Sequence, residues 1–361
     1  SLIQIRIRTQ RIMKLNITNF TATSKRPYVV CKLAFLGLTT IIVFSELFIS
    51  SAQAHHSRSG FDSNTISKYE GTVSKVEWRN PHVYITVDLA SGGNWLFETD
   101  AIPILLRSGW SSNSITVGET VIVHGNPGKN DQERRALLTS ITKDDGSVLS
   151  PRSHFENADN DTIAQSAVGV SSLAGIWELP NGDSGSFLPT WENIRLTPKA
   201  ITSREAFSPE DRPAGKCIGT PTPMIMAMPY LNEIELGDDI IYIRSEFLNN
   251  ERVVYMDGRG HPESGTRTNQ GHSIGLWEDN TLVVDTVLFE DHRAPIRGKN
   301  EGVPSGTNKH VVEKYTLSDD GTKVTIEFTV EDTEYLAEPF SEIIEWVHLP
   351  NYELSEFSCD Q

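Results

Sequence analysis

Cysteine and basic residues are scarce in this chain. Only three of its 361 residues are cysteine, which excludes a miniprotein held together by many disulfides. Lysine and arginine number 32 against 48 aspartate and glutamate residues, so the formal net charge is −16. Nucleic-acid binding needs a basic surface that displaces counterions from phosphates, so no nucleic-acid partner is expected. Charged residues at 22% and hydrophobic residues at 38% fit a globular protein and exclude a polytopic membrane protein.

Motifs of several enzyme classes are also missing. The sequence contains no glycine-rich phosphate loop, no HExxH metalloprotease motif and no CxxC pair. Ser273 follows His272 within a predicted strand, where adjacent side chains point to opposite faces. This pair is therefore not expected to act as a nucleophile and its base, and a hydrolase with a catalytic triad is disfavoured.

The first 54 residues are typical of an export signal. Residues 33–50 form an apolar run that follows Lys25, Arg26 and Lys32 and precedes Ala52-Gln53-Ala54, an A-x-A cleavage site. A transmembrane anchor is the alternative, because the run is near the shortest spanning length, but Glu46 inside it favours a cleaved signal. Residues 1–12 precede the first methionine and would lie upstream of a start at that residue. We expect a periplasmic or secreted protein without a membrane span, whose net charge falls from −16 to −22 after cleavage.

Two cysteines, Cys217 and Cys359, remain after such a cleavage. In an oxidising compartment an even pair predicts a disulfide, which here would tie the C-terminal tail to a distant loop. Two free buried thiols are the alternative.

Residues 55–145 predict a small β-barrel. Five runs of strand type are visible, at residues 69–78, 82–89, 94–99, 119–124 and 136–142. A helix-like stretch after Pro103, closed by Gly109, separates the third run from the fourth. Five strands with a helix in this place indicate an OB-like barrel domain. Residues 146–172 are polar without periodicity and predict a linker.

Residues 173–361 predict a second, larger all-β domain. Its clearest strands are expected at residues 240–247, 251–256, 272–277, 281–286, 310–316, 323–330 and 341–349. With a first strand that begins near Gly175 and Trp177, they make roughly eight antiparallel strands joined by short turns. This pattern indicates a lipocalin-like antiparallel β-barrel.

Both halves resemble uncharacterised exported bacterial proteins. The sequence AHHS, followed by GTVSKVEWRNPHVYITVD and LLRSGW, resembles one such family over residues 55–145. The stretches GHSIGLWEDNTLVVDT, VPSGTNKHVVEKY and FTVEDTEYL resemble a second set of secreted proteins of unknown function. These resemblances imply the fold and an exported location, and they imply no activity.

Histidines of the first domain could bind copper. If cleavage follows Ala54, the mature chain starts with His55, whose α-amine and ring nitrogen can chelate one metal ion. His56, His82 or His124 would supply a further nitrogen for Cu(II). Incidental histidines on a frayed N-terminus are the alternative interpretation.

Polar residues alternate with apolar ones along the strands of the second domain. His272 and His310 are candidate general acids or bases, with Asp285, Arg244 and Arg252 as electrostatic partners. If these polar faces point into the barrel, they line a ligand cavity. If they point outward, they form solvated ion pairs of little energetic value.

A methionine-rich stretch, residues 221–230, holds Met224, Met226 and Met228 between prolines. It could be a lid over a ligand, a Cu(I) site or a segment packed against the barrel. With Tyr242 and Trp277, these methionines are the candidate ligand-binding residues.

The leading function is binding of a small apolar or amphipathic ligand in the second barrel. One alternative is an enzyme, such as a lyase, isomerase or non-triad hydrolase, that uses a histidine and a carboxylate as an acid–base pair. Another is a periplasmic copper-binding protein. The sequence indicates no other cofactor and names no protein partner.

Overall fold

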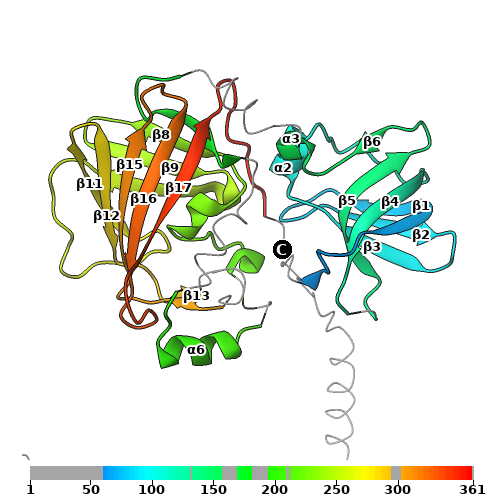
Figure 1. Ribbon diagram of the computed structural model, residues 1–361, viewed down its shortest axis with the longest axis horizontal. Helices are drawn as coiled ribbons and strands as arrows, with labels where there is room; N and C mark the ends of the chain where they lie inside the picture. The colour runs from blue at the N-terminus through cyan, green and yellow to red at the C-terminus, as the bar shows by residue number, and fades with distance from the viewer. Residues whose placement is uncertain are drawn as a thin grey trace, which may run out of the picture. The chain divides into compact units, whose positions relative to one another are not determined.

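The computed structural model describes residues 60–130, 132–156, 169–180, 194–208, 211, 213–293 and 302–359. Figure 1 shows two strand-rich bodies that differ in size. The predicted export signal and residues 157–168 of the predicted linker lie outside the described residues. Within those ranges, no helix has the length and apolar character needed to cross a membrane.

The first body is a small closed barrel. Its elements are β1 (Ser67–Glu77), β2 (Tyr84–Leu89), β3 (Asn94–Glu98), α2 (Ile102–Arg107), β4 (Thr120–Pro127), β5 (Arg135–Lys143) and β6 (Val148–Leu149). The strand order is β3-β2-β1-β4-β5-β6, and a parallel pairing of β3 with β5 closes the first five strands. This order and the helix between β3 and β4 confirm the predicted OB-like barrel.

The alternation of residue types explains why these segments form strands. Val73, Ile85, Val87, Val121 and Val123 are all buried in the barrel core. Polar residues such as Ser74 and Thr86 alternate with them in β1 and β2, whereas Ile122 stands between the two valines of β4.

The helix α2 ends where the sequence predicts it. Gly109 has φ +81°, a left-handed conformation that glycine adopts without strain, and its N–H donates to the carbonyl of Leu106. Leu105 of this helix is fully buried in the barrel core.

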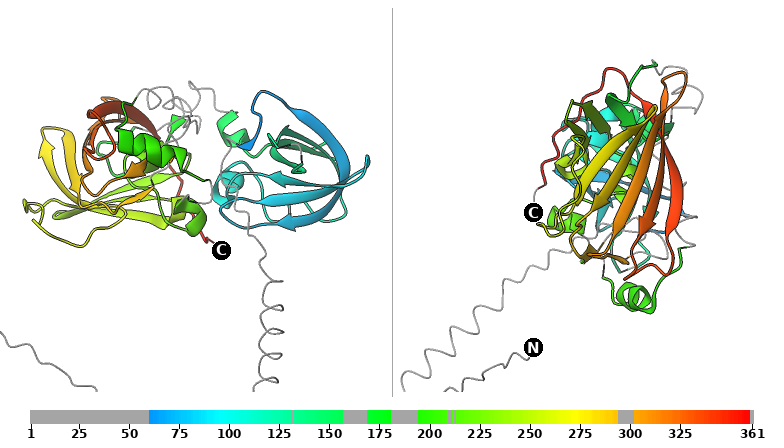
Figure 2. Two further views of the ribbon diagram at one scale, coloured as in Figure 1. Left: turned by 90° about the horizontal axis from the view of Figure 1, so that it is seen from below. Right: turned by 90° about the vertical axis from the view of Figure 1, so that its left-hand side faces the viewer.

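The second body is a closed barrel of nine strands. They are β7 (Gly175–Glu178), β8 (Asn232–Leu236), β9 (Ile240–Ser245), β10 (Asn250–Tyr255), β11 (His272–Glu278), β12 (Thr281–Val287), β15 (His310–Leu317), β16 (Lys323–Glu331) and β17 (Phe340–His348). Their order is β10-β11-β12-β15-β16-β17-β7-β8-β9, and β9 closes the barrel on β10. In Figure 2 the neighbouring strands β15, β16 and β17 run side by side, in orange to red.

Two details of this barrel differ from the expectation. Strand β8 was not predicted, because its sequence NEIEL carries two glutamates and reads as polar. The pairing of β10 with β11 is parallel, over two residue pairs, because residues 256–271 carry the chain back before β11 begins. All other pairings in the barrel are antiparallel, as predicted.

Short elements lie between the longer strands along the chain. They are α3 (Ser153–Glu156), α6 (Pro198–Glu205), η5 (Pro213–Lys216), η6 (Met224–Ala227), η7 (Phe247–Asn249), β13 (His292–Arg293) and β14 (Pro304–Ser305). The predicted disulfide is present: Cys217, next to η5, bonds to Cys359 in the C-terminal tail.

The methionine-rich segment lies inside the larger barrel. All residues from 221 to 230 are buried. The indole N–H of Trp346 donates to the carbonyl of Met226 at 3.0 Å, and the Tyr315 hydroxyl lies 3.2 Å from the Met226 sulfur. Thr222 donates to the Glu313 carboxylate at 2.7 Å. These partners are buried residues of β15 and β17, so the segment is part of the barrel core and not a lid over it.

Candidate functional site

A cluster of histidines and carboxylates lies on the outer face of the larger barrel. His272 (β11), Asp285 (β12) and His310 (β15) come from three adjacent strands, and His261 comes from the loop before β11. The Nδ1 atoms of His261 and His272 are 2.9 Å apart. Asp285 Oδ1 lies 3.1 Å from His261 Nε2 and 2.9 Å from His310 Nε2. The structure therefore brings the predicted residues His272, Asp285 and His310 together. His261, which was not predicted from the sequence, connects His272 to Asp285.

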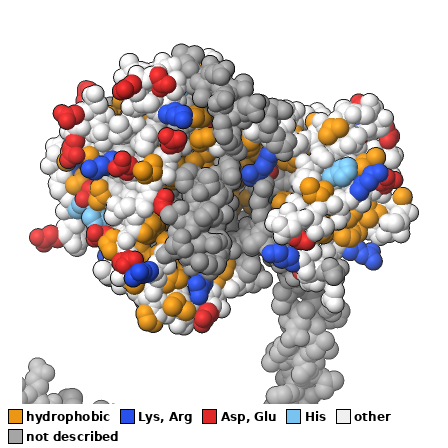
Figure 3. All heavy atoms as spheres, viewed as in Figure 1, with side chains coloured by type: hydrophobic (Ala, Val, Ile, Leu, Met, Phe, Trp, Pro, Cys, Tyr) orange, Lys and Arg blue, Asp and Glu red, His pale blue; other side chains and the backbone are white. Residues whose placement is uncertain are grey.

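The strand register explains this arrangement. Val284, Thr286 and Val311 are buried and face the barrel core, so the intervening Asp285 and His310 face outward. Figure 3 shows histidine and acidic side chains together at the edge of the view where Figure 1 labels β11 and β12.

His272 has a perturbed acidity within this cluster. Partial burial, the neighbouring His261 and Arg259 lower its pKa below the ordinary value of 6.5. The ring of Tyr255 stacks on it, with the centroids 5.3 Å apart. The lowered pKa favours the neutral imidazole of His272, the form that can accept a proton.

Residues 271–275 have the G-x-S-x-G spacing of a nucleophile elbow, which was not recognised in the sequence. In a nucleophile elbow this spacing occupies a sharp turn between a strand and a helix. Here Ser273 lies within β11, is buried, and its hydroxyl bonds to the Thr286 hydroxyl at 2.8 Å. The serine thus faces the core while His272 faces outward, and the two form no nucleophile–base pair.

The two candidate arginines lie away from the histidine cluster. Arg244 is on the outer face of β9, where it bonds to Glu233 at 2.8 Å, Glu235 at 2.6 Å and Glu251 at 2.8 Å. Arg252 faces the opposite way, into the barrel, and is buried. Neither is placed to act as the electrostatic partner of His272 or His310.

Arg252 belongs to a buried polar network in the barrel core. Its guanidinium makes two bonds to Glu313, at 2.5 and 3.2 Å, and a third to the Tyr315 hydroxyl at 2.8 Å. Burial opposes the charge on Arg252, but the Glu313 carboxylate raises the arginine pKa above its ordinary value. Burial together with the same carboxylate raises the pKa of Tyr315.

The candidate ligand-binding residues are dispersed. Met226 and Met228 are packed in the core. The Tyr242 ring lies on the outer face under Arg244, 4.6 Å from centroid to guanidinium carbon. Trp277 is 46% exposed at the end of β11. One of the five, Met224, lines a pocket in the described part of the chain.

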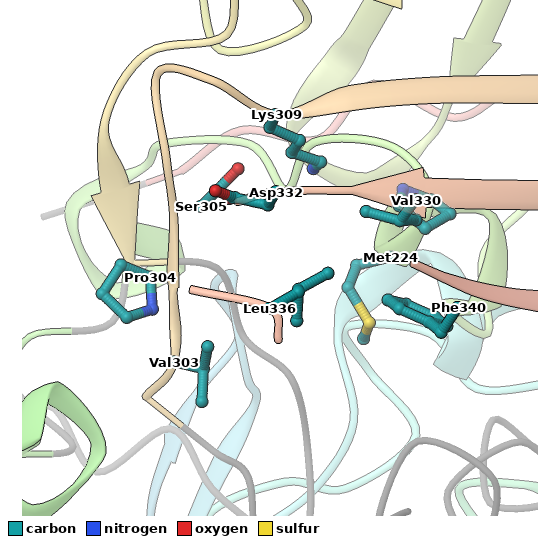
Figure 4. Close-up of a pocket in the computed structure, with 10 residues that line it drawn as sticks. Met224, Val303, Pro304, Ser305, Lys309, Val330, Asp332, Leu336 and Phe340 are labelled. Carbon is teal, nitrogen blue, oxygen red and sulfur yellow. The ribbon is translucent and has the colours of Figure 1, made fainter. Parts of the chain in front are cut away.

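This pocket lies at the end of the barrel where β15 begins and β16 ends. Its lining residues are Pro223, Met224, Val303, Pro304, Ser305, Lys309, Val330, Asp332, Leu336 and Phe340. Figure 4 shows Lys309, Ser305 and Asp332 gathered at one side, with Leu336, Met224 and Phe340 on the other. The pocket is therefore amphipathic, with one polar corner.

Each polar group of this corner is almost completely buried. The Lys309 amine donates to the carbonyl of Thr222 at 2.5 Å and lies 4.4 Å from the centroid of the Phe289 ring. The Asp332 carboxylate accepts the N–H of Gly306 at 2.7 Å. The Ser305 hydroxyl has no hydrogen-bond partner among the described residues. A buried hydroxyl without a hydrogen-bond partner lowers the stability of the fold and is rare in native proteins, so its presence here needs an explanation.

Burial also shifts the acidities in this corner. It lowers the pKa of Lys309 to about 7, although the carboxylates of Asp332 and Glu313 favour the charged amine. It raises the pKa of Asp332 above the ordinary value of 3.8. No pattern in the sequence points to these residues, because a lysine in a turn between strands is normally solvated.

Two of the histidines considered for copper, His82 and His124, are not brought together. His55 and His56 lie outside the described residues. His124 pairs with Lys68 near the start of β1, whereas His82 lies before Tyr84, which pairs with Glu77 at the end of β1. Nine strand residues span about 30 Å, so His82 and His124 cannot share an ion. Among the described residues, no group of three histidine, cysteine, aspartate or glutamate side chains has an arrangement that could hold a metal ion.

Comparison with known families covers part of the chain. Residues 47–136 match the model of a family of unknown function, DUF6152. This agrees with the resemblance of the first half to uncharacterised proteins, and the resemblance of the second half stays a prediction. No curated protein matches the chain.

Proposed function

We propose that this protein is exported and binds a small apolar or amphipathic molecule in the end pocket of its nine-stranded barrel. The observation that carries the proposal is the Ser305 hydroxyl, which lines the pocket, is 3% exposed and has no partner in the described part of the chain. A ligand with a polar end would provide that partner. Its apolar part would contact Met224, Leu336 and Phe340.

We place the ligand at the end of the barrel and not in its interior. The interior is filled by residues 221–230, which are buried against Trp346 and Tyr315. At the end, the same segment contributes Pro223 and Met224 to the pocket wall. The disulfide agrees with an oxidising compartment, which supports export. The division into an OB-like domain, a linker and a barrel domain is part of this proposal.

Filling the pocket should abolish binding. We expect Leu336→Trp to weaken the binding of 1-anilinonaphthalene-8-sulfonate at least about tenfold, about 1.4 kcal/mol, because the indole occupies the apolar side. Fluorescence titration measures the affinity. The matched control is Ile343→Trp on the outer face of β17, where the side chain is 53% exposed and binding should be unchanged.

A second variant tests the polar corner without adding bulk. Ser305→Ala removes a hydroxyl that has no partner in the described structure, so the free energy of unfolding should stay the same or rise. The affinity for the probe should nevertheless fall. Equal probe affinity in native protein, Leu336→Trp and Ser305→Ala would refute ligand binding at this pocket.

We also propose acid–base chemistry at the outer cluster as a second candidate function. The continuous contacts from His272 through His261 and Asp285 to His310 favour it, because a carboxylate that orients imidazoles is typical of acid–base sites.

The protonation midpoint of His272 tests this second function. In an NMR titration we expect its midpoint to lie below 6.5, since partial burial and His261 lower its pKa. His261→Gln should move the midpoint back toward 6.5, and His124→Gln on the other barrel should leave it unchanged. A midpoint at or above 6.5 in the native protein would argue against His272 as a base near neutral pH.

A further inference from the structure

The end pocket is lined by a buried primary amine, a buried carboxyl and a hydroxyl that has no hydrogen-bond partner among the described residues. Lys309 is 6% exposed, Ser305 3% and Asp332 4%, and all three line the same pocket. Lysine is among the residues least often buried, and the Lys309 amine uses one of its three donor positions on the carbonyl of Thr222. Between Lys309 and Asp332 no contact within ion-pair distance is present in the described structure. The amine is thus placed against a cavity and is not neutralised by a carboxylate in direct contact.

We propose that this pocket binds small molecules that carry an aldehyde or ketone group on an apolar chain, and that the Lys309 amine joins them as an imine. This inference rests on the proposed ligand-binding function. It names the ligand class that suits an amine at the polar corner of an otherwise apolar pocket. Desolvated lysines in apolar surroundings are the amines that form Schiff bases with carbonyl compounds.

Burial keeps the Lys309 amine reactive near neutral pH, against the carboxylates that face it. Burial disfavours the ammonium form and Arg252 acts in the same direction, whereas Asp332 and Glu313 act against them. Burial prevails, and the pKa of Lys309 falls to about 7. About half of the amine is therefore unprotonated at pH 7, while an exposed lysine with a pKa of about 10.4 is almost entirely protonated.

The chemistry balances with the groups in the pocket. The neutral amine nitrogen attacks the carbonyl carbon, the carbonyl oxygen takes a proton, and the amine loses one, which gives a carbinolamine. The nitrogen lone pair then forms the C=N bond while the hydroxyl group leaves as water. The Ser305 hydroxyl is available to donate to the carbonyl oxygen. The Asp332 carboxyl, whose pKa burial raises, lines the same pocket and can pass a proton to the departing hydroxyl, which leaves water, a protonated imine and the Asp332 carboxylate.

Reductive trapping tests the inference on the native protein. Incubation of the full chain with hexanal and sodium cyanoborohydride converts an imine into a stable secondary amine. Intact-mass and peptide mapping should find one hexyl group, on Lys309. The reaction at Lys309 should be half-maximal near pH 7, following the lysine pKa of about 7. Exposed lysines such as Lys314, on the outer face of β15, should react only at higher pH.

Two variants and one competitor separate the possible failures. Lys309→Arg keeps the positive charge but cannot form an imine, so the adduct should disappear, while Lys314→Arg should not change it. A hexyl group spread over exposed lysines, with none on Lys309 in the native protein, would overturn the inference. If 1-hexanol displaces 1-anilinonaphthalene-8-sulfonate while hexanal leaves Lys309 unmodified, the carbonyl inference fails and ligand binding stands. If 1-hexanol does not displace the fluorescent probe and hexanal does not modify Lys309, the ligand-binding proposal and the carbonyl inference both fail.

Discussion

Arg252→Met should lower the free energy of unfolding by about 3–5 kcal/mol. The change removes one half of a buried ion pair and leaves the Glu313 carboxylate, which is 0% exposed, without its two arginine bonds. It also takes away the bond from Arg252 to the Tyr315 hydroxyl. Urea unfolding of native protein and variant, followed by tryptophan fluorescence, measures the difference.

The control for this prediction is the exposed ion-pair cluster on the same barrel. Arg244→Met removes bonds to three carboxylates, yet these groups are partly solvated, so the loss should not exceed about 1 kcal/mol. The double variant Arg252→Met with Glu313→Leu should regain much of the stability lost in Arg252→Met, because no charge is then left unpaired. Equal losses in the Arg252 and Arg244 variants would contradict the interpretation of a desolvated pair.

Cys359→Ser should cost up to about 5 kcal/mol, the value that loop entropy assigns to a disulfide closing a loop of this length. The two cysteines are separated by 142 residues, so the bond removes much conformational freedom from the unfolded chain. In the folded state the tail has a second attachment, because Phe357 and Asn249 exchange two hydrogen bonds of 2.8 and 3.1 Å. The native fold should therefore persist in the variant, with a lower midpoint of thermal unfolding.

Reduction of the native protein provides the matching measurement. Dithiothreitol should lower the midpoint of the native protein to that of Cys359→Ser and should not affect the variant. The double variant with Cys217→Ser should behave like Cys359→Ser, since the first substitution already removes the bond. An unchanged midpoint on reduction would show that the bond does not restrict the unfolded chain.

The strands were predictable because their side chains alternate. The runs predicted at residues 240–247, 281–286, 310–316 and 323–330 all coincide with strands of the larger barrel within a few residues. In these runs the residues that face the barrel core are mostly apolar, with Ser245, Thr286 and Glu313 as the polar exceptions, and this alternation is typical of strands with one buried face. Strand β8 is not predicted from the sequence, because its outward residues, Glu233 and Glu235, are both acidic. Their ion-pair partner, Arg244, lies on the next strand.

The candidate site was predictable only in part. Alternation correctly separates outward Asp285 from inward Thr286, and the cross-strand register then brings His272, Asp285 and His310 together. His261 lies in a loop rich in glycine and proline, where no periodicity indicates a direction. Nothing in the sequence indicates that Lys309 is buried, because its burial depends on Thr222, which is 87 residues away.

The fold class follows from patterns in the amino-acid sequence. Its alternating patterns specify two β-barrels, the helix and strand order specifies the OB-like topology, and two cysteines specify one disulfide. What fills the barrel, and where a ligand has room, became visible in the folded structure. The sequence of the methionine-rich segment is compatible with a lid over the barrel and with a segment packed inside it. Burial of the methionine side chains stabilises either arrangement. Its place in the lumen follows from long-range contacts with Tyr315 and Trp346, which local sequence does not encode.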